Sequence, residues 1–290
     1  MILRGMFVCS VVCAGALFWT GAAEGRALFY PTASRAAENQ LSGKWQPPST
    51  NNAWACDVKF AVGKGGPLSD ETVTRRVWCD RQQPGYWRKT VKVKSGRTYL
   101  SGTWAKLSPS KLLLNHTAKN GQTGKYLQER LYYFCGFNPQ LLPYFSEETQ
   151  ALVTGDPERW RLFYRTMTFP EGTVKDALNV SFGLYINAGD ITFADSFFVD
   201  VTDLPSTMEV DIAGEKPIKR LSVKYMGLRD TLWEKTFNPP VTDFSCTLPP
   251  EVNAFRDGPN APRGHALVIY YADGTRQTVY APEQGCFVSR

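Results

Sequence analysis

The sequence predicts an all-β protein, and three observations lead to that prediction. Apolar and polar residues alternate in short runs such as residues 90–94, whose two valines would share one face of a strand. Glycine and proline separate four or more such runs at regular spacing, and Asp273-Gly274 is a two-residue hairpin signal between two of them. The composition is 43% hydrophobic, with 17 Phe, 13 Tyr and 8 Trp among 290 residues, and can fill the core of a sandwich or barrel.

The N-terminal residues have the pattern of a secretory signal peptide. Arg4 supplies the positive charge, residues 6–19 form an apolar or small-residue run, and Gly21-Ala22-Ala23 offers a cleavage site. The run is shorter than the ~20 residues that a transmembrane helix needs. We expect residues 1–23 to be removed, which leaves a secreted or extracytoplasmic protein with no transmembrane segment. An uncleaved membrane anchor is the alternative.

The chain length predicts two domains. An N-terminal arm at 24–44, with an edge strand at 28–30, precedes the main run of strands. Asp203-Leu204-Pro205-Ser206 marks a boundary, after which the last 85 or so residues match the size of an immunoglobulin-like sandwich. We predict a first β-sandwich domain at 45–204 and an immunoglobulin-like β domain at 205–290.

Five cysteines remain once the signal is removed, and an odd number leaves at least one thiol unpaired or paired between chains. Cys56 and Cys79 have similar flanking residues, which favours a Cys56–Cys79 disulfide between neighbouring strands. We expect a second disulfide, Cys246–Cys286, in the second domain, and the fifth cysteine is Cys135. Zinc is disfavoured, because the chain has no Cys-x-x-Cys pair and two histidines in all.

Charge is uneven along the chain, whose formal net charge is +6. Residues 81–125 contain ten Lys or Arg and no Asp or Glu. Such a run is ordinarily a solvated face. The alternative is attraction to an anionic partner, for which an acidic polysaccharide or a cell-envelope glycan suits an exported protein better than nucleic acid does. We expect no nucleic-acid partner, because no nucleic-acid-binding motif accompanies the charge.

Three segments follow one another in a recognisable order. The first comprises Gly85-Tyr86-Trp87-Arg88 and residues 91–106, with the pattern V-x-G-x-x-Y-x-x-S-x-W-x-K. The second is Trp160-Arg161 with Thr168-Phe169-Pro170-Glu171-Gly172, and the third is residues 188–195, AGDITFAD. Together they resemble secreted carbohydrate-binding modules of the galactose-binding-like jelly-roll type, over roughly residues 45–203. The resemblance implies a jelly-roll β-sandwich for the first domain.

The resemblance also implies roles for individual residues. It places Trp104 and Trp160 in the core, and it matches Asp195 to an acidic position that often helps to hold a structural calcium ion. Ala194 departs from the family, which usually has another acidic residue there. No cofactor is required, and a structural Ca²⁺ with Asp195 as a ligand is allowed.

The motifs do not define the sugar-binding side chains, which lie on variable loops or on one face of this fold. Sugar rings present apolar C–H faces that stack on Trp or Tyr, and their hydroxyl groups bond planar polar side chains. For each candidate ring the alternative is packing in the core. The candidates are Trp54, Trp78, Tyr86, Trp87, Arg88, Gln128, Arg130 and Tyr132, with Trp45 and Tyr133 as further aromatic choices.

One segment, Glu209 to Glu215, is similar to the carboxylate strand of laminarinase-like glycoside hydrolases. Glu209 and Asp211 would share a strand face, but Glu215 comes one residue too late for the pattern. Gly-x-Ser-x-Gly elbows and phosphate-binding loops are absent from the sequence. We therefore expect a non-catalytic, secreted protein whose partner is a polysaccharide or another glycan. The alternatives are a structural or adhesive cell-surface protein and a polysaccharide-acting glycoside hydrolase.

Overall fold

The computed structural model describes residues 25–48, 58–79, 85–108, 128–136, 145–152, 159–172, 177–184, 189–225, 230–254 and 264–282. For residues 107–108, 128–136, 145–152, 184 and 189 the description is limited to the backbone. The described residues form fourteen strands and one short 3-10 helix, η1 (Thr32–Arg35). The strands are β1 (Arg26–Pro31), β2 (Lys59–Lys64), β3 (Val73–Cys79), β4 (Gly85–Lys92), β5 (Thr98–Ser108), β6 (Gln128–Gly136), β7 (Phe145–Leu152), β8 (Arg161–Thr168), β9 (Ala177–Leu184), β10 (Gly189–Asp200), β11 (Met208–Tyr225), β12 (Thr231–Thr247), β13 (His265–Tyr271) and β14 (Arg276–Ala281).

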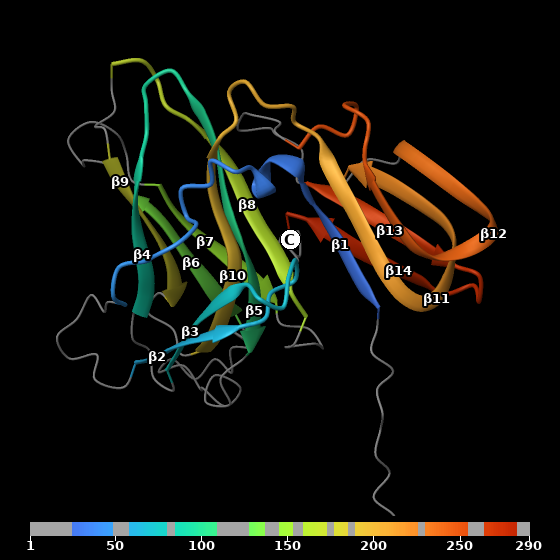
Figure 1. Ribbon diagram of the computed structural model, residues 1–290, viewed down its shortest axis with the longest axis horizontal. Coiled ribbons are helices and arrows are strands. Elements are labelled where there is room, and N and C mark those ends of the chain that lie inside the picture. The colour runs from blue at the N-terminus through green and yellow to red at the C-terminus, as the bar shows by residue number, and fades with distance from the viewer. Residues whose placement is uncertain are drawn as a thin grey trace, which may run out of the picture.

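The strands form three sheets that lie side by side as layers (Figure 1). The middle sheet has the order β2-β3-β10-β5-β8, and the outer sheet has the order β4-β9-β6-β7. The C-terminal sheet has the order β1-β11-β13-β14, with β12 paired to β11. The prediction of an all-β, sandwich-like protein is confirmed.

The first core lies between the middle and outer sheets. Strand alternation turns Val77 of β3 and Trp87 of β4 inward, and each is buried there. Phe182 of β9 and Phe193 of β10 meet across the interior, with ring centroids 5.7 Å apart. These apolar side chains leave water on folding, at about 25 cal/mol per Å² of buried surface, so the sandwich interior is a main source of its stability.

The second core lies on the opposite face of the middle sheet, against the C-terminal sheet. Leu100 and Trp104 of β5 and Leu162 of β8 belong to it, whereas the residues that follow two of them in sequence, Ala105 and Phe163, belong to the first core. Along β5 and β8 the middle sheet is therefore buried on both faces, which explains why these strands carry apolar residues on both faces.

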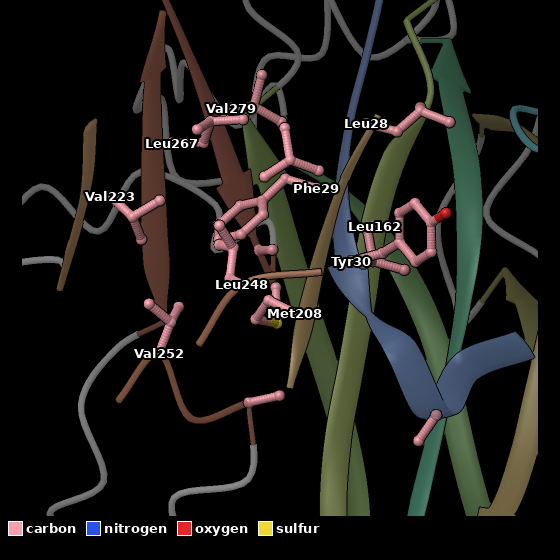
Figure 2. Close-up of a cluster of buried hydrophobic side chains, with 14 of the residues drawn as sticks. Leu28, Phe29, Tyr30, Leu162, Met208, Val223, Leu248, Val252, Leu267 and Val279 are labelled. Carbon is pink, nitrogen blue, oxygen red and sulfur yellow. The ribbon is translucent and has the colours of Figure 1, made fainter. Parts of the chain in front are cut away.

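Strand β1 fastens the N-terminal arm to the C-terminal sheet. It pairs antiparallel with β11, from Arg26 opposite Ala213 to Pro31 opposite Met208, so the edge strand expected at 28–30 is confirmed. Phe29 points towards Leu267 and Val279 of the C-terminal sheet, whereas Leu28 and Tyr30 extend to the other side of β1, where Tyr30 lies beside Leu162 of the middle sheet (Figure 2). Residues from both ends of the chain thus share one core.

A β-bulge in β10 redirects the side chains of that strand. The register of β10 against β5 shifts between Ala194 and Phe197, and Asp195 within the bulge has a φ of +45°. Phe193 lies in the first core and Phe197 in the second, although residues four apart on a regular strand would share a face. The extra residue therefore reverses the alternation, so that Phe197 faces the second core instead of the first.

The hairpin expected at Asp273-Gly274 is confirmed, because β13 and β14 pair antiparallel on either side of it. Within the described ranges, no helix is long and apolar enough to cross a membrane. The expected signal peptide lies outside the described residues, as do Cys56 and Cys286, so both expected disulfides stay predictions.

Candidate functional site

One face of the middle sheet carries a group of aromatic and charged side chains that is not buried. Arg76 of β3 lies opposite Thr192 of β10, which lies opposite Lys106 of β5. Asp190 of β10 lies opposite Trp78 of β3, two residues before Thr192 and two residues after Arg76, since the strands are antiparallel. Residues directly opposite each other share a face of the sheet, so these five side chains lie on one surface.

We call this surface the platform. It lies on the face that carries Trp104 and the second core, beyond the part that the C-terminal sheet covers. Arg76 and Lys59 are exposed, and the other members are half-buried. The platform consists of Lys59, Arg76, Trp78, Lys106, Trp160, Asp190 and Thr192.

At one end of the platform a guanidinium is fixed over an indole. Arg76 donates from Nε to Asp190 Oδ1 (2.8 Å) and from Nη2 to Asp190 Oδ2 (2.5 Å), a two-point ion pair. Its guanidinium carbon lies 4.6 Å from the ring centre of Trp78. Because both partners of the ion pair are partly exposed, it contributes little to stability, about 0–1 kcal/mol, and its main effect is to hold Arg76 in place.

At the other end an ammonium group lies over a second indole. Lys106 Nζ is 5.1 Å from the ring centre of Trp160, the residue that precedes β8. The expected core position of Trp104 is confirmed, since this side chain is 2% exposed. The core assignment of Trp160 is corrected: the side chain is half-buried and packs against the second core without being one of its buried members.

The platform has the size and charge of a surface for an extended polar ligand. β3 and β8 are separated by three inter-strand spacings of about 4.8 Å, so Trp78 and Trp160 lie roughly 14 Å apart across the sheet. Three cations, Lys59, Arg76 and Lys106, accompany a single carboxylate, that of Asp190. Two indole rings with hydrogen-bonding groups on the strands between them can hold a sugar chain, and the lysine and arginine side chains can also bond its acidic groups.

A second cation–aromatic group lies on the inner face of β3, at the edge of the sandwich. Trp45 and Trp87 are each 7% exposed, and the guanidinium carbon of Arg75 lies 4.7 Å and 6.0 Å from their ring centres. Lys89 of β4 lies close enough for Arg75 to lower its pKa. We call Trp45, Arg75, Trp87 and Lys89 the edge cluster. The structure thus brings Trp45 and Trp87 together, but in the first core and apart from Trp78.

The remaining predicted glycan-binding residues in the described strands lie on the outer sheet, apart from the platform. Tyr86 of β4 and Tyr132 of β6 lie opposite the same residue of β9, Gly183. Tyr86 is buried, at 8% exposed, and Arg88 is half-buried with its Nε donating to Gln46 Oε1 (2.8 Å). Both lie on the face of β4 opposite Trp87, as strand alternation requires. Trp54 lies outside the described residues. Gln128, Arg130, Tyr132 and Tyr133 belong to β6, of which only the backbone is described, so their side chains lie outside the description as well.

Asp195, the expected calcium ligand, accepts hydrogen bonds from within the chain. Its Oδ1 accepts from Thr72 Oγ1 (3.0 Å) and its Oδ2 from the Leu68 N–H (3.3 Å), which pins the turn between β2 and β3 to the bulge. Burial raises the pKa of its carboxyl. No group of three or more His, Cys, Asp or Glu in the described part of the chain could hold a metal ion. These residues do not supply the further carboxylates that calcium needs, so calcium at Asp195 stays a prediction.

The carboxylates of the hydrolase-like segment have structural partners. Glu209 Oε1 accepts from Thr247 Oγ1 (2.8 Å) and from Thr32 Oγ1 (3.2 Å), and Asp211 pairs with Arg26 at 2.7 Å. They lie on β11 between β1 and β12, and their bonds fasten the strands together. Glu215 is two residues beyond the paired stretch that ends at Ala213.

Five platform residues were missed by the sequence analysis: Lys59, Arg76, Lys106, Asp190 and Thr192. The i, i+2 spacing of Arg76 with Trp78 and of Asp190 with Thr192 was a usable signal, since it puts each pair on one strand face. These pairs lie side by side because of the register of β3, β10 and β5. The residues of these strands lie far apart in sequence, so no local pattern shows that register.

Comparison with known proteins identifies no family: the chain matches no protein-family model and no curated protein. Similar solved structures include a carbohydrate-binding module, CBM4, at 14% identity over 53% of this chain and 94% of that chain, with a TM-score of 0.32. TmCBM61 in complex with β-1,4-galactotriose is 18% identical over 54% of this chain and 88% of that chain, with a TM-score of 0.33.

A third similar structure is the enzymatically active domain of tailspike protein 4 of bacteriophage CBA120. It is 12% identical over 54% of this chain, with a TM-score of 0.36, and the match spans 19% of that domain. With TM-scores below 0.4 and identities below 20%, none of these likenesses carries an argument about function.

Proposed function

We propose that this chain is a non-catalytic carbohydrate-binding protein that acts outside the cytoplasm, and that the platform is its glycan-binding surface. One observation carries the proposal: two half-buried tryptophans, Trp78 and Trp160, lie on a single sheet face, each with a cation against its ring. Indole rings of this kind offer apolar area to a sugar while the strands beneath keep them rigid.

The polar groups between the rings support the same proposal. Asp190 and Thr192 of β10 lie between the two indoles, and Arg76 lies against Trp78. These residues present carboxylate, hydroxyl and guanidinium groups that can bond sugar hydroxyls. Because the ion pair fixes Arg76 and Asp190 in advance, a sugar that bonds them does not have to order these side chains. The positive charges of Lys59 and Lys106 favour a glycan that carries carboxylate or sulfate groups.

The test is a glycan array followed by calorimetric titration of the best acidic and neutral oligosaccharides. Trp78→Ala and Trp160→Ala are each expected to weaken binding about tenfold, the effect of losing roughly 1.4 kcal/mol of contact with a ring. Trp233→Ala is the matched control, because Trp233 is a half-buried tryptophan of β12 outside the platform. Unchanged binding in both platform variants would refute the assignment of the surface. No binding by any glycan would favour a protein partner and the adhesive alternative.

A further inference from the structure

The edge cluster, on the inner face of β3, has a geometry of its own. Trp45 comes from the segment that runs beside β4, where the Gln46 N–H donates to Arg88 O (3.0 Å). Trp45 and Trp87 are nearly buried, and Arg75 lies against both rings. A guanidinium in this position is shielded from water on one side by apolar surface, which strengthens its electrostatic interactions with any group on the other side.

Two cations of the edge cluster converge on one turn. Arg75 Nη2 donates to Gly43 O at 3.4 Å, and Lys89 Nζ donates to Ser42 O. Both acceptors are uncharged carbonyl oxygens of consecutive residues. Neither cation forms an ion pair with a described residue, whereas the adjacent Arg76 has Asp190. Most of the five N–H donors of Arg75 are therefore without an acceptor in the described part of the chain.

The lack of a counter-charge has electrostatic consequences. Burial lowers the pKa of Arg75 to about 10, and burial together with the nearby guanidinium lowers the pKa of Lys89. Both shifts mean that the positive charges are held in an unfavourable environment. An anion placed between them would relieve the desolvation of both groups and their mutual repulsion.

The turn is open to solvent, so a ligand can reach the two cations. Ser42, Gly43 and Lys44 are exposed. Gly43 has a φ of +78°, and a Cβ atom built there would meet nothing within 4 Å. The open side of the turn thus has room for a group larger than a methyl, and Lys44 adds a third positive charge beside it.

We propose that Arg75 and Lys89 bind one oxyanion, a carboxylate or a sulfate group, at the turn formed by residues 42–44. The guanidinium can donate two parallel N–H bonds to two oxygens of the anion, and the ammonium can donate to the same group. This site lies on the opposite face of β3 from the platform and does not depend on the proposed function. The anion is supplied either by free inorganic salt or by the acidic group of a glycan.

The test uses thermal unfolding of the full mature chain in sodium sulfate and, at equal ionic strength, in sodium chloride. Sulfate stabilises many proteins without a site, so the readout is the difference between wild type and variants. At ten times the Kd, site binding is expected to raise the Tm of the wild type by about 3 °C above the general effect. Arg75→Gln and Lys89→Gln are expected to lose this increment. Arg88→Gln, a change of the same charge one residue away on the other face of β4, is expected to keep it.

Each result of the sulfate experiment either supports or overturns the proposed anion site. Equal sulfate increments in the wild type, Arg75→Gln and Lys89→Gln would mean an adventitious ion only, and would overturn the site. If Arg75→Gln does not fold, Lys89→Gln with its Arg88→Gln control carries the comparison. Repeating the measurement with sodium glucuronate and with a uronic-acid oligosaccharide separates the two sources: a larger site-specific gain for the oligosaccharide than for glucuronate assigns the site to a glycan, and equal gains assign it to a free anion. The platform variants Trp78→Ala and Trp160→Ala are expected to keep the sulfate increment, so the two proposals can fail separately.

Discussion

Arg75 and Arg76 are neighbours on one strand, yet they belong to two different kinds of surface. Strand alternation turns Arg76 outwards onto the platform, where Asp190 compensates its charge and Trp78 lies beneath it. The same alternation turns Arg75 inwards onto Trp45 and Trp87, without a carboxylate among the described residues. A guanidinium over a ring is held in a fixed position when a carboxylate pairs with it. Without such a carboxylate, it attracts an anion.

The largest expected effect is a difference in unfolding free energy between two variants. One removes Trp45, which lies against Arg75, and the other removes Trp78, which lies against Arg76. Trp45→Ala should cost about 3–5 kcal/mol of unfolding free energy, because Trp45 is nearly buried against Phe182 and Phe193 and its loss leaves a cavity. Trp78→Ala should cost less than about 1 kcal/mol, since this side chain is half-buried at the surface. Denaturant unfolding of both variants measures the difference. Equal costs would contradict the division into core and platform.

The second effect concerns the ion pair on the platform. Asp190→Asn should weaken glycan binding about three- to tenfold while changing stability by less than about 1 kcal/mol, because the pair positions Arg76 more than it stabilises the sheet. Titration calorimetry gives the first number and urea unfolding gives the second. Glu234→Gln is the control, as it removes a comparable exposed ion pair with Arg220 far from the platform. A loss of binding in the control as well would point to a general charge effect.

The third effect compares the two arginines directly. Arg75→Met should leave stability unchanged or raise it by up to about 1 kcal/mol, because it replaces an uncompensated, partly buried charge with an apolar side chain of similar length. Arg76→Met should lower stability by up to about 1 kcal/mol through loss of the exposed ion pair. Thermal unfolding in chloride, without sulfate, measures both. The same sign for both variants would remove the distinction between the two arginines.

The smallest effect concerns the bulge of β10, which contains Asp195. Burial raises the pKa of Asp195 above the unfolded value, so the native state binds this proton more tightly than the unfolded chain does. The charged carboxylate is therefore destabilising at pH 7, and the cost is relieved as the pH falls through the folded pKa. Asp195→Asn keeps an acceptor for Thr72 and tolerates the positive φ. The stability of the wild type relative to this variant should rise between pH 7 and pH 4, and a fall would contradict the sign.

How much could be predicted from the sequence depended on the range of the interactions. Alternation in residues 90–94, the Asp273-Gly274 turn and the edge strand at 28–30 are local patterns, and each was confirmed. Pairing of β1 with β11 joins residues about 180 positions apart, and no local pattern encodes it. The burial of both faces of β5 and β8 likewise depends on contacts between residues far apart in sequence.

The site was harder to predict for the same reason. The sequence picked out Trp78 and Trp87 as rings that could stack on a sugar, but which face of its strand each ring occupies follows from the register of β3 and β4 in the sheets. Trp160 was assigned to the core because its motif is structural in the modules that the sequence resembles, whereas here the side chain is half-buried beside the second core. Burial at a sheet rim is set by what packs above it, and a single strand's sequence does not specify that.

Whether the platform is the glycan-binding surface can be tested directly by an NMR titration. It follows the indole N–H signals of the tryptophans during addition of the best acidic oligosaccharide. Trp78→Phe and Trp160→Phe assign their two signals by difference. If the platform binds the glycan, these two signals shift first and with one Kd, while the signal of the buried Trp104 stays in place. Shifts confined to Trp45 and Trp87, with Trp78 and Trp160 unmoved, would contradict it and transfer glycan binding to the edge cluster.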